Sequence, residues 1–200
     1  QESSLPCVFP PFPGRREFNI YASMSAAKEI GGDFYDFYFI DDKNFMFLIA
    51  DVSGKGIPSA LFMMTAKTLI ANIAQTKLPP KEMIEEINRK ICADNKEGFF
   101  ITMFAFIINL ETGIISCMNC GHNPPLLYRS GEDYKYLKIG HNIVLGVFPE
   151  AKYEIFEMKL NKGDRIFLYT DGVTEALNSK DEMYGEARLL DYINKFKNTD

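Results

Sequence analysis

The sequence predicts an α+β fold in which hairpins form antiparallel sheets and helices cover them. Apolar, β-prone runs occur in pairs around short turns, as hairpins require. Two helical patterns follow one another directly, so helices do not alternate with strands as they would in a parallel sheet. Of the 200 residues, 46% are hydrophobic. A chain of this length buries roughly 70% of its surface, which is enough for one domain with a substantial core.

The N-terminal residues predict an extended segment. Prolines stand at positions 6, 10, 11 and 13, and proline is not tolerated inside a helix. We interpret residues 1–16 as the end of an N-terminal linker and residues 17–200 as the domain. Residues 18–23 alternate apolar and polar side chains, which predicts a first strand.

The first hairpin joins two β-prone runs, residues 34–40 and 45–50, through the turn Asp41-Asp42-Lys43-Asn44. A turn centred between Asp42 and Lys43 would place Asp33 opposite Val52, one step from Asp51. The two aspartates therefore belong to the open end of the hairpin.

Two helices are predicted after the hairpin. Residues 58–76 carry Pro58 in the first turn, where proline is tolerated, and are apolar over most of the helix surface. We expect this helix to be buried, with Ala60, Leu61, Met64, Leu69 and Ile73 among its apolar residues. Pro79-Pro80 ends it and starts a second helix with an apolar stripe on one face and charges on the other.

The remaining elements are short and mostly β. A second hairpin is predicted from two runs around a Glu-Thr-Gly turn, and four further strands and a last helix follow. In chain order, these elements are residues 99–110, 114–119, 126–128, 134–137, 153–160, 165–169 and the helix 186–196.

The charge pattern excludes some function classes. The chain has 22 Lys and Arg against 27 Asp and Glu, a net charge of −5 without a block of like charge. A nucleic-acid binder would carry a basic patch, so no nucleic-acid partner is expected. No apolar run approaches the length that spans a bilayer and no signal peptide opens the chain. We therefore expect a cytoplasmic domain, which a longer protein could tether to a membrane.

The cysteines predict neither disulfides nor a metal site. Cys117 and Cys120 form a C-x-x-C, but a zinc site needs a second Cys or His pair at matching spacing. We interpret them as thiols on a strand in a reducing compartment.

Three aspartates are the candidate metal ligands. Asp33 and Asp51 lie near each other across the open hairpin end, where two carboxylates repel unless a cation separates them. Asp171 follows an apolar strand and precedes a glycine, so it lies on the rim of a sheet. Carboxylate oxygens suit hard divalent ions. Taken singly, Asp33 or Asp51 is more often a residue that flanks a turn, and Asp171 is as often a turn former.

Other residues leave their chemistry open. Gly54-Lys55 lacks the spacing of a P-loop, although a glycine-rich turn before Pro58 can direct backbone N–H groups toward an anion. His122, in Gly-His-Asn-Pro-Pro, has two interpretations: a general acid, or a residue that fixes a turn by hydrogen bonds. Ser53 lacks an evident base for a nucleophilic role.

Four motifs together resemble a known family. In chain order they are Gly-Gly-Asp-Phe-Tyr-Asp from Gly31, Asp-Val-Ser-Gly-Lys-Gly from Asp51, Gly-His-Asn-Pro-Pro from Gly121 and Tyr-Thr-Asp-Gly-Val-Thr-Glu-Ala from Tyr169. The chain resembles the PPM, or type 2C, metal-dependent Ser/Thr protein phosphatases of the bacterial RsbU and SpoIIE type. The similarity extends over nearly the whole chain.

The resemblance implies a fold, two ions and their ligands. It implies a central antiparallel β-sandwich flanked by helices in α-β-β-α layers, with two Mn²⁺ or Mg²⁺ ions at one end. By position, Asp33 and Asp51 would hold or bridge both ions, the Val52 carbonyl would contact one, and Asp171 would hold the other. A water activated by the ions would hydrolyse phosphoserine or phosphothreonine.

The resemblance also implies partners. The substrate would be a phosphorylated anti-sigma-factor antagonist with a STAS fold. An N-terminal sensor or regulatory domain would control the activity, and the N-terminal linker could form a homodimer.

The sequence departs from the family pattern at three places. Ser53 stands where eukaryotic members carry a histidine, and their phosphate-binding arginine is unmatched, with Lys28 and Lys55 as weak substitutes. Family members also close with a strand that opens on Asp-Asp and supplies a metal ligand. Residues 186–200 hold no such strand, so we expect a domain truncated at its C-terminus. The alternative to an active phosphatase is a catalytically silent module that binds a partner protein.

Overall fold

The computed structural model describes residues 5–25 and 31–198. Their contacts divide the chain into two compact units. The first unit contains residues 1–122 and 141–159, and the second contains residues 123–140 and 160–200. We describe each unit by itself.

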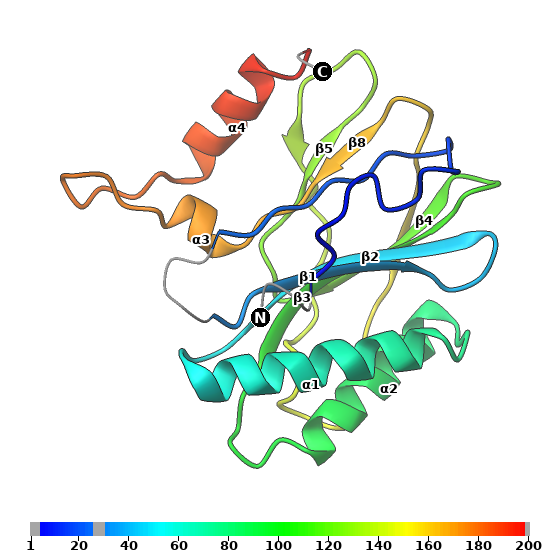
Figure 1. Ribbon diagram of the computed structural model, residues 1–200, viewed down its shortest axis with the longest axis vertical. Coiled ribbons are helices and arrows are strands. Elements are labelled where there is room, and N and C mark those ends of the chain that lie inside the picture. The colour runs from blue at the N-terminus through cyan, green and yellow to red at the C-terminus, as the bar shows by residue number, and fades with distance from the viewer. Residues whose placement is uncertain (1–4, 26–30, 199–200) are drawn as a thin grey trace. The chain divides into compact units, whose positions relative to one another are not determined.

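The first unit is a five-stranded antiparallel sheet with two helices on one face. The strand order is β1-β2-β3-β4-β7, and α1 and α2 lie together against the same face of the sheet (Figure 1). The elements are β1 (Phe34–Phe39), β2 (Asn44–Val52), α1 (Ile57–Ala74), α2 (Pro80–Ala93), β3 (Ile101–Asn109), β4 (Ile114–Cys120) and β7 (Phe156–Lys159). The predicted first and second hairpins and both helices are confirmed.

Alternation along the strands sends neighbouring residues to opposite faces of the sheet. On β2, Leu48, Ala50 and Val52 belong to the main core that α1 and α2 cover. Asp51 therefore lies on the opposite face, with Phe47, whose ring stacks on Phe106 of β3 at 4.9 Å between centroids. The helices cover one face, and the candidate metal ligand belongs to the other.

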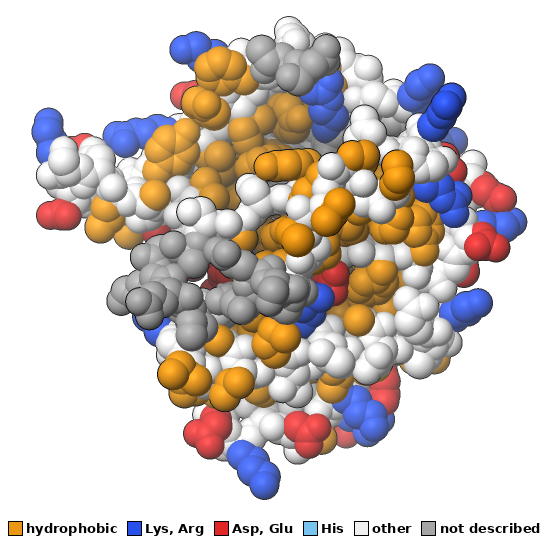
Figure 2. Space-filling model, viewed as in Figure 1, with side chains coloured by type: hydrophobic (Ala, Val, Ile, Leu, Met, Phe, Trp, Pro, Cys, Tyr) orange, Lys and Arg blue, Asp and Glu red, His pale blue; other side chains and the backbone are white. Residues whose placement is uncertain are grey.

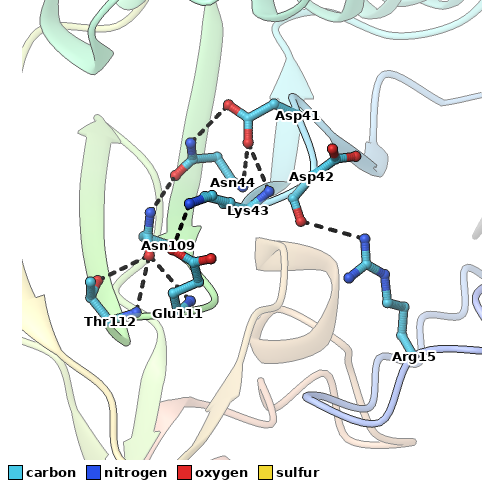
Figure 3. A network of polar contacts seen from close by, with 8 residues as sticks. All are labelled: Arg15, Asp41, Asp42, Lys43, Asn44, Asn109, Glu111 and Thr112. Carbon is cyan, nitrogen blue, oxygen red and sulfur yellow. Dashed lines mark hydrogen bonds and ion pairs between the residues drawn. The ribbon is translucent and has the colours of Figure 1, made fainter.

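The register of the first hairpin differs from the prediction by one residue. Phe34 pairs with Ala50 and Phe39 with Phe45, so the turn is centred on Asp42 and not between Asp42 and Lys43. Asp41 stabilises this turn, because its Oδ1 accepts hydrogen bonds from the N–H groups of both Lys43 and Asn44, each at 2.8 Å (Figure 3). The predicted pairing of Asp33 with Val52 is wrong.

The prediction that α1 is buried over most of its surface is also wrong. Its buried residues form one face that includes Met63, Ala66 and Ile70, whereas Leu61 is 65% exposed and Met64 is 38% exposed. Orange side chains reach the surface where α1 begins, at the lower left of Figure 2. By length and composition alone α1 could cross a membrane, but its buried face belongs to the main core, as in a core helix of a globular domain.

Residues 18–23 form no strand in the structure, so that prediction is wrong. The N-terminal segment instead packs through its aromatic rings against β1 and β2. Phe18 lies 4.5 Å from Phe45 between ring centroids, and Phe12 meets Phe39 edge-on at 5.1 Å. Side-chain packing, and not strand pairing, holds these rings in place. The prediction failed because a strand needs a pairing partner, which an alternating pattern does not supply.

The second unit has its own small sheet and core. Its strands β5 (Leu126–Tyr128), β6 (Lys135–Tyr136) and β8 (Arg165–Phe167) pair in the order β6-β5-β8. Helices α3 (Asp171–Thr174) and α4 (Glu186–Lys195) follow. Leu126, Tyr134, Tyr169 and Leu189 form the core of this unit.

An ion pair supports the second unit. The Asp164 side chain is only 2% exposed and accepts from Arg129 Nη1 at 2.6 Å. It also accepts from the N–H groups of Ser130 and Asn161. Burial raises the pKa of Asp164, but these hydrogen bonds and the Arg129 charge outweigh burial and hold the pKa below its usual value.

The two cysteines of the C-x-x-C lie on β4, as expected. Cys117 and Cys120 are buried free thiols, and burial raises the pKa of Cys117 to about 12. A thiol with so high a pKa does not ionise near neutral pH, so it is an inert core residue.

Candidate metal centre

The open end of the first hairpin brings two predicted ligands together. Extending the register past Phe34 and Ala50 places Asp33 directly opposite Asp51, and the Val52 N–H donates to the Gly32 carbonyl at 3.4 Å in agreement. Directly opposed residues have Cβ atoms ~4.5–5.5 Å apart on the same face. The two carboxylates are therefore closer neighbours than the sequence predicted.

Gly32 allows this close approach of the two chains. A Cβ atom at Gly32 would lie 2.5 Å from the Val52 carbonyl oxygen and 2.7 Å from Ser59 Oγ. The same carbonyl accepts a hydrogen bond from the buried Ser59 hydroxyl at 3.3 Å. The Val52 carbonyl, the third predicted ligand of this end, is thus fixed between the start of α1 and the backbone of Gly32.

Ser53 has a structural role. Its Oγ accepts from the Phe100 N–H at 2.9 Å, and its own N–H donates to the Phe100 carbonyl at 2.9 Å. These bonds tie the loop after β2 to the start of β3. Of the two lysines considered for phosphate binding, Lys55 is exposed, and Lys28 lies outside the described residues.

Asp171 belongs to the second unit. It is the first residue of the short helix α3, preceded by Thr170 as the N-cap, and it is exposed. It does not sit directly on the end of β8, which stops at Phe167.

The oxygen donors of the open end fit a hard divalent cation. Two opposed carboxylates and a fixed carbonyl are the ligand types that Mg²⁺ and Mn²⁺ prefer. Among residues 5–25 and 31–198, no group of three or more His, Cys, Asp or Glu side chains lies together in a way that could hold a metal ion. Asp33 and Asp51 therefore provide a two-carboxylate edge that needs further oxygen ligands.

Sequence reasoning assigned no role to Asp36, the last residue of the first motif. Its Oδ2 lies 2.7 Å from Lys67 Nζ on α1, and the two side chains are 10% and 16% exposed. Asp33 and Asp36 are three positions apart, and side chains alternate between faces along a strand, so the two residues lie on opposite faces of the sheet. The alternation of faces along the motif could have predicted that Asp36 lies on the face opposite to Asp33.

Sequence reasoning also missed Thr102. It pairs with Asp51 in the register of β2 and β3, and its Oγ1 lies 2.8 Å from His122 Nδ1. No sequence signal in β3 distinguishes Thr102, because its significance depends on which residue stands opposite.

Comparisons with known proteins identify the family of this chain. The family model described as Stage II sporulation protein E (SpoIIE) matches residues 41–200. The phosphoserine phosphatase RsbU of Bacillus subtilis (strain 168) is 34% identical over 164 residues, which cover 82% of this chain and 48% of RsbU. This chain thus spans about half the length of that relative.

Solved structures share the fold. The RsbU and RsbW domains of Rv1364c from Mycobacterium tuberculosis superpose with a TM-score of 0.74 at 22% identity, covering 87% of this chain and 49% of that one. RsbX in complex with magnesium gives a TM-score of 0.59 at 21% identity, covering 86% of this chain and 83% of that one. These structures share an α+β fold with this chain, and because a family model matches most of its length, the chain belongs to the SpoIIE family.

Proposed function

We propose that this domain hydrolyses phosphoserine or phosphothreonine on a signalling protein in a metal-dependent reaction. The observation that carries the proposal is the opposed pair Asp33 and Asp51 at the open hairpin end. The relative named a phosphoserine phosphatase supports the reaction class.

The residues at the open hairpin end would have different roles. Asp33, Asp51 and the Val52 carbonyl would hold Mn²⁺ or Mg²⁺, and the magnesium complex of RsbX supports that choice of ions. When bound, two such ions supply an activated water and offset charge on the phosphoryl oxygens. Gly32 and Ser59 keep the Val52 carbonyl in place. Ligation by Asp171 remains a prediction from the resemblance.

The substrate and the regulation follow from the same resemblance. We propose a phosphorylated STAS-type anti-sigma-factor antagonist as substrate, in the cytoplasm. An N-terminal sensor or regulatory domain would control the activity, with a homodimer formed through the linker. Relatives more than twice as long as the matched region leave room for such domains.

Hydrolysis of p-nitrophenyl phosphate with and without Mn²⁺ tests the proposal. We expect Mn²⁺-dependent turnover that falls by more than about 100-fold in Asp51→Asn, because a lost ligand removes several kcal/mol of transition-state stabilisation. Asp42→Asn, an exposed residue at the turn of the same hairpin, is the matched control and keeps wild-type turnover.

Three outcomes are informative. Equal turnover in Asp51→Asn and wild type would overturn the proposed site. Mn²⁺ binding without hydrolysis would favour the silent binding module. Neither binding nor hydrolysis in wild type would overturn the proposal.

A further inference from the structure

A third side chain shares the edge of the sheet with the two aspartates. Thr102 on β3 is the direct partner of Asp51 on β2. Paired residues of antiparallel strands point to the same face, with Cβ atoms ~4.5–5.5 Å apart. Thr102 is therefore the neighbour of Asp51 on the side away from Asp33.

Thr102 is in turn held by a buried histidine. His122 Nδ1 lies 2.8 Å from Thr102 Oγ1, and His122 is only 6% exposed. A single hydrogen bond to a β-branched side chain selects one of its few χ1 rotamers. The imidazole thus determines which way the Thr102 hydroxyl and methyl groups face.

The histidine is fixed by its own surroundings. The backbone N–H of His122 donates to Asn119 Oδ1 at 2.9 Å. Gly121 before it has φ of +70°, and a Cβ atom there would lie 2.6 Å from Val144 Cγ1. Only glycine suits both the positive φ and the contact, so the backbone presents His122 in one direction.

The hydrogen bond between His122 and Thr102, together with the pairing of Thr102 with Asp51, connects the buried histidine to a proposed metal ligand. We propose that His122 acts through Thr102 as a positioning residue that holds the Asp51 carboxylate ready for the metal ion. Residues behind metal ligands typically change metal affinity 10–100-fold when removed, because they pre-orient the ligand. The inference rests on the proposed function, since it requires that Asp51 bind the ion.

The test compares variants that remove or retain the hydrogen bond. Thr102→Val keeps the shape and removes the hydroxyl, whereas Thr102→Ser keeps the hydroxyl. His122→Leu removes the nitrogen, whereas His122→Asn offers an amide near the position of Nδ1. Mn²⁺ titrated into each purified protein is followed by the electron paramagnetic resonance signal of free Mn²⁺, and the thermal midpoint without metal is recorded.

We expect Thr102→Val and His122→Leu to weaken Mn²⁺ binding about 10-fold or more, with Thr102→Ser and His122→Asn restoring most of the affinity. A purely structural role would lower the thermal midpoint and leave the Mn²⁺ dissociation constant of the folded protein unchanged. If Thr102→Val does not fold, the comparison of His122→Leu with His122→Asn tests the positioning role instead.

The outcomes separate the two proposals. Wild-type affinity in both Thr102→Val and His122→Leu would overturn the positioning role while Mn²⁺-dependent hydrolysis by wild type still supports the proposed function. Absence of Mn²⁺ binding and hydrolysis in wild type would overturn both.

Discussion

The two ends of the first hairpin use aspartate in opposite ways. At the turn, Asp41 accepts three hydrogen bonds, from the N–H groups of Lys43 and Asn44 and from the Asn44 side chain. Asn109 on β3 extends this network to the next hairpin (Figure 3). At the open end, Asp33 and Asp51 stand opposite one another.

The difference separates stability from function within one pair of strands. Local donors at the turn satisfy the Asp41 carboxylate, which therefore stabilises the turn. Two carboxylates placed directly opposite each other destabilise a sheet, and a cation between them reverses that effect. The turn end contributes stability, and the open end contributes the candidate metal ligands.

The largest effect on the folded domain is expected at Gly32. Gly32→Ala forces a methyl group against the Val52 carbonyl, so we expect a loss of about 1–3 kcal/mol in the free energy of unfolding together with weaker Mn²⁺ binding. Gly31→Ala is the matched control, because its Cβ would meet only Asp33 N at 4.0 Å. Equal urea midpoints and Mn²⁺ affinities for the two variants would contradict the close approach.

The turn end should lose stability without losing function. Asn109 Oδ1 accepts from the N–H groups of Glu111 and Thr112, and Nδ2 donates to Asn44 Oδ1. Asn109→Ala should cost about 1–2 kcal/mol in urea unfolding and leave the Mn²⁺ dissociation constant unchanged. A change in Mn²⁺ affinity would show that the two ends are coupled.

Acid should weaken the turn. Hydrogen bonds from the Asn44 side chain and from the N–H groups of Lys43 and Asn44 hold the pKa of Asp41 below its usual value. A depressed folded pKa stabilises the protein above the unfolded pKa of ~3.9, and that stabilisation is lost as pH falls through the folded value. The difference in thermal midpoint between wild type and Asp41→Asn should therefore narrow between about pH 5 and pH 2. A constant difference would contradict this role of the carboxylate.

The smallest effect is expected for the ion pair beside the turn. Lys43 Nζ lies 2.9 Å from Glu111 Oε2, but the side chains are 58% and 60% exposed. Water and salt screen such pairs, so Lys43→Gln should leave the thermal midpoint unchanged within error at both low and high salt. A salt-dependent drop would assign the ion pair a share of the turn's stability.

Local pattern predicted most elements of the fold. The β-prone runs around Asp41–Asn44 and the amphipathic stripe of α2 formed as expected, because period and turn chemistry are read from neighbouring residues. The strand predicted at residues 18–23 from alternation is wrong, since a strand also needs a pairing partner. The predicted burial of α1 is wrong for another reason, since apolar composition does not show which face of a helix is buried.

The sequence by itself determined the α+β class, the two hairpins, the family and the residue types of the candidate centre. Tertiary structure decided that Asp33 faces Asp51, because the register depends on backbone pairing along the whole of β1 and β2. It also placed Thr102 beside Asp51 and His122 behind Thr102. Asp51 and Thr102 lie on strands separated by two helices in the chain, and only backbone pairing across the sheet brings them together.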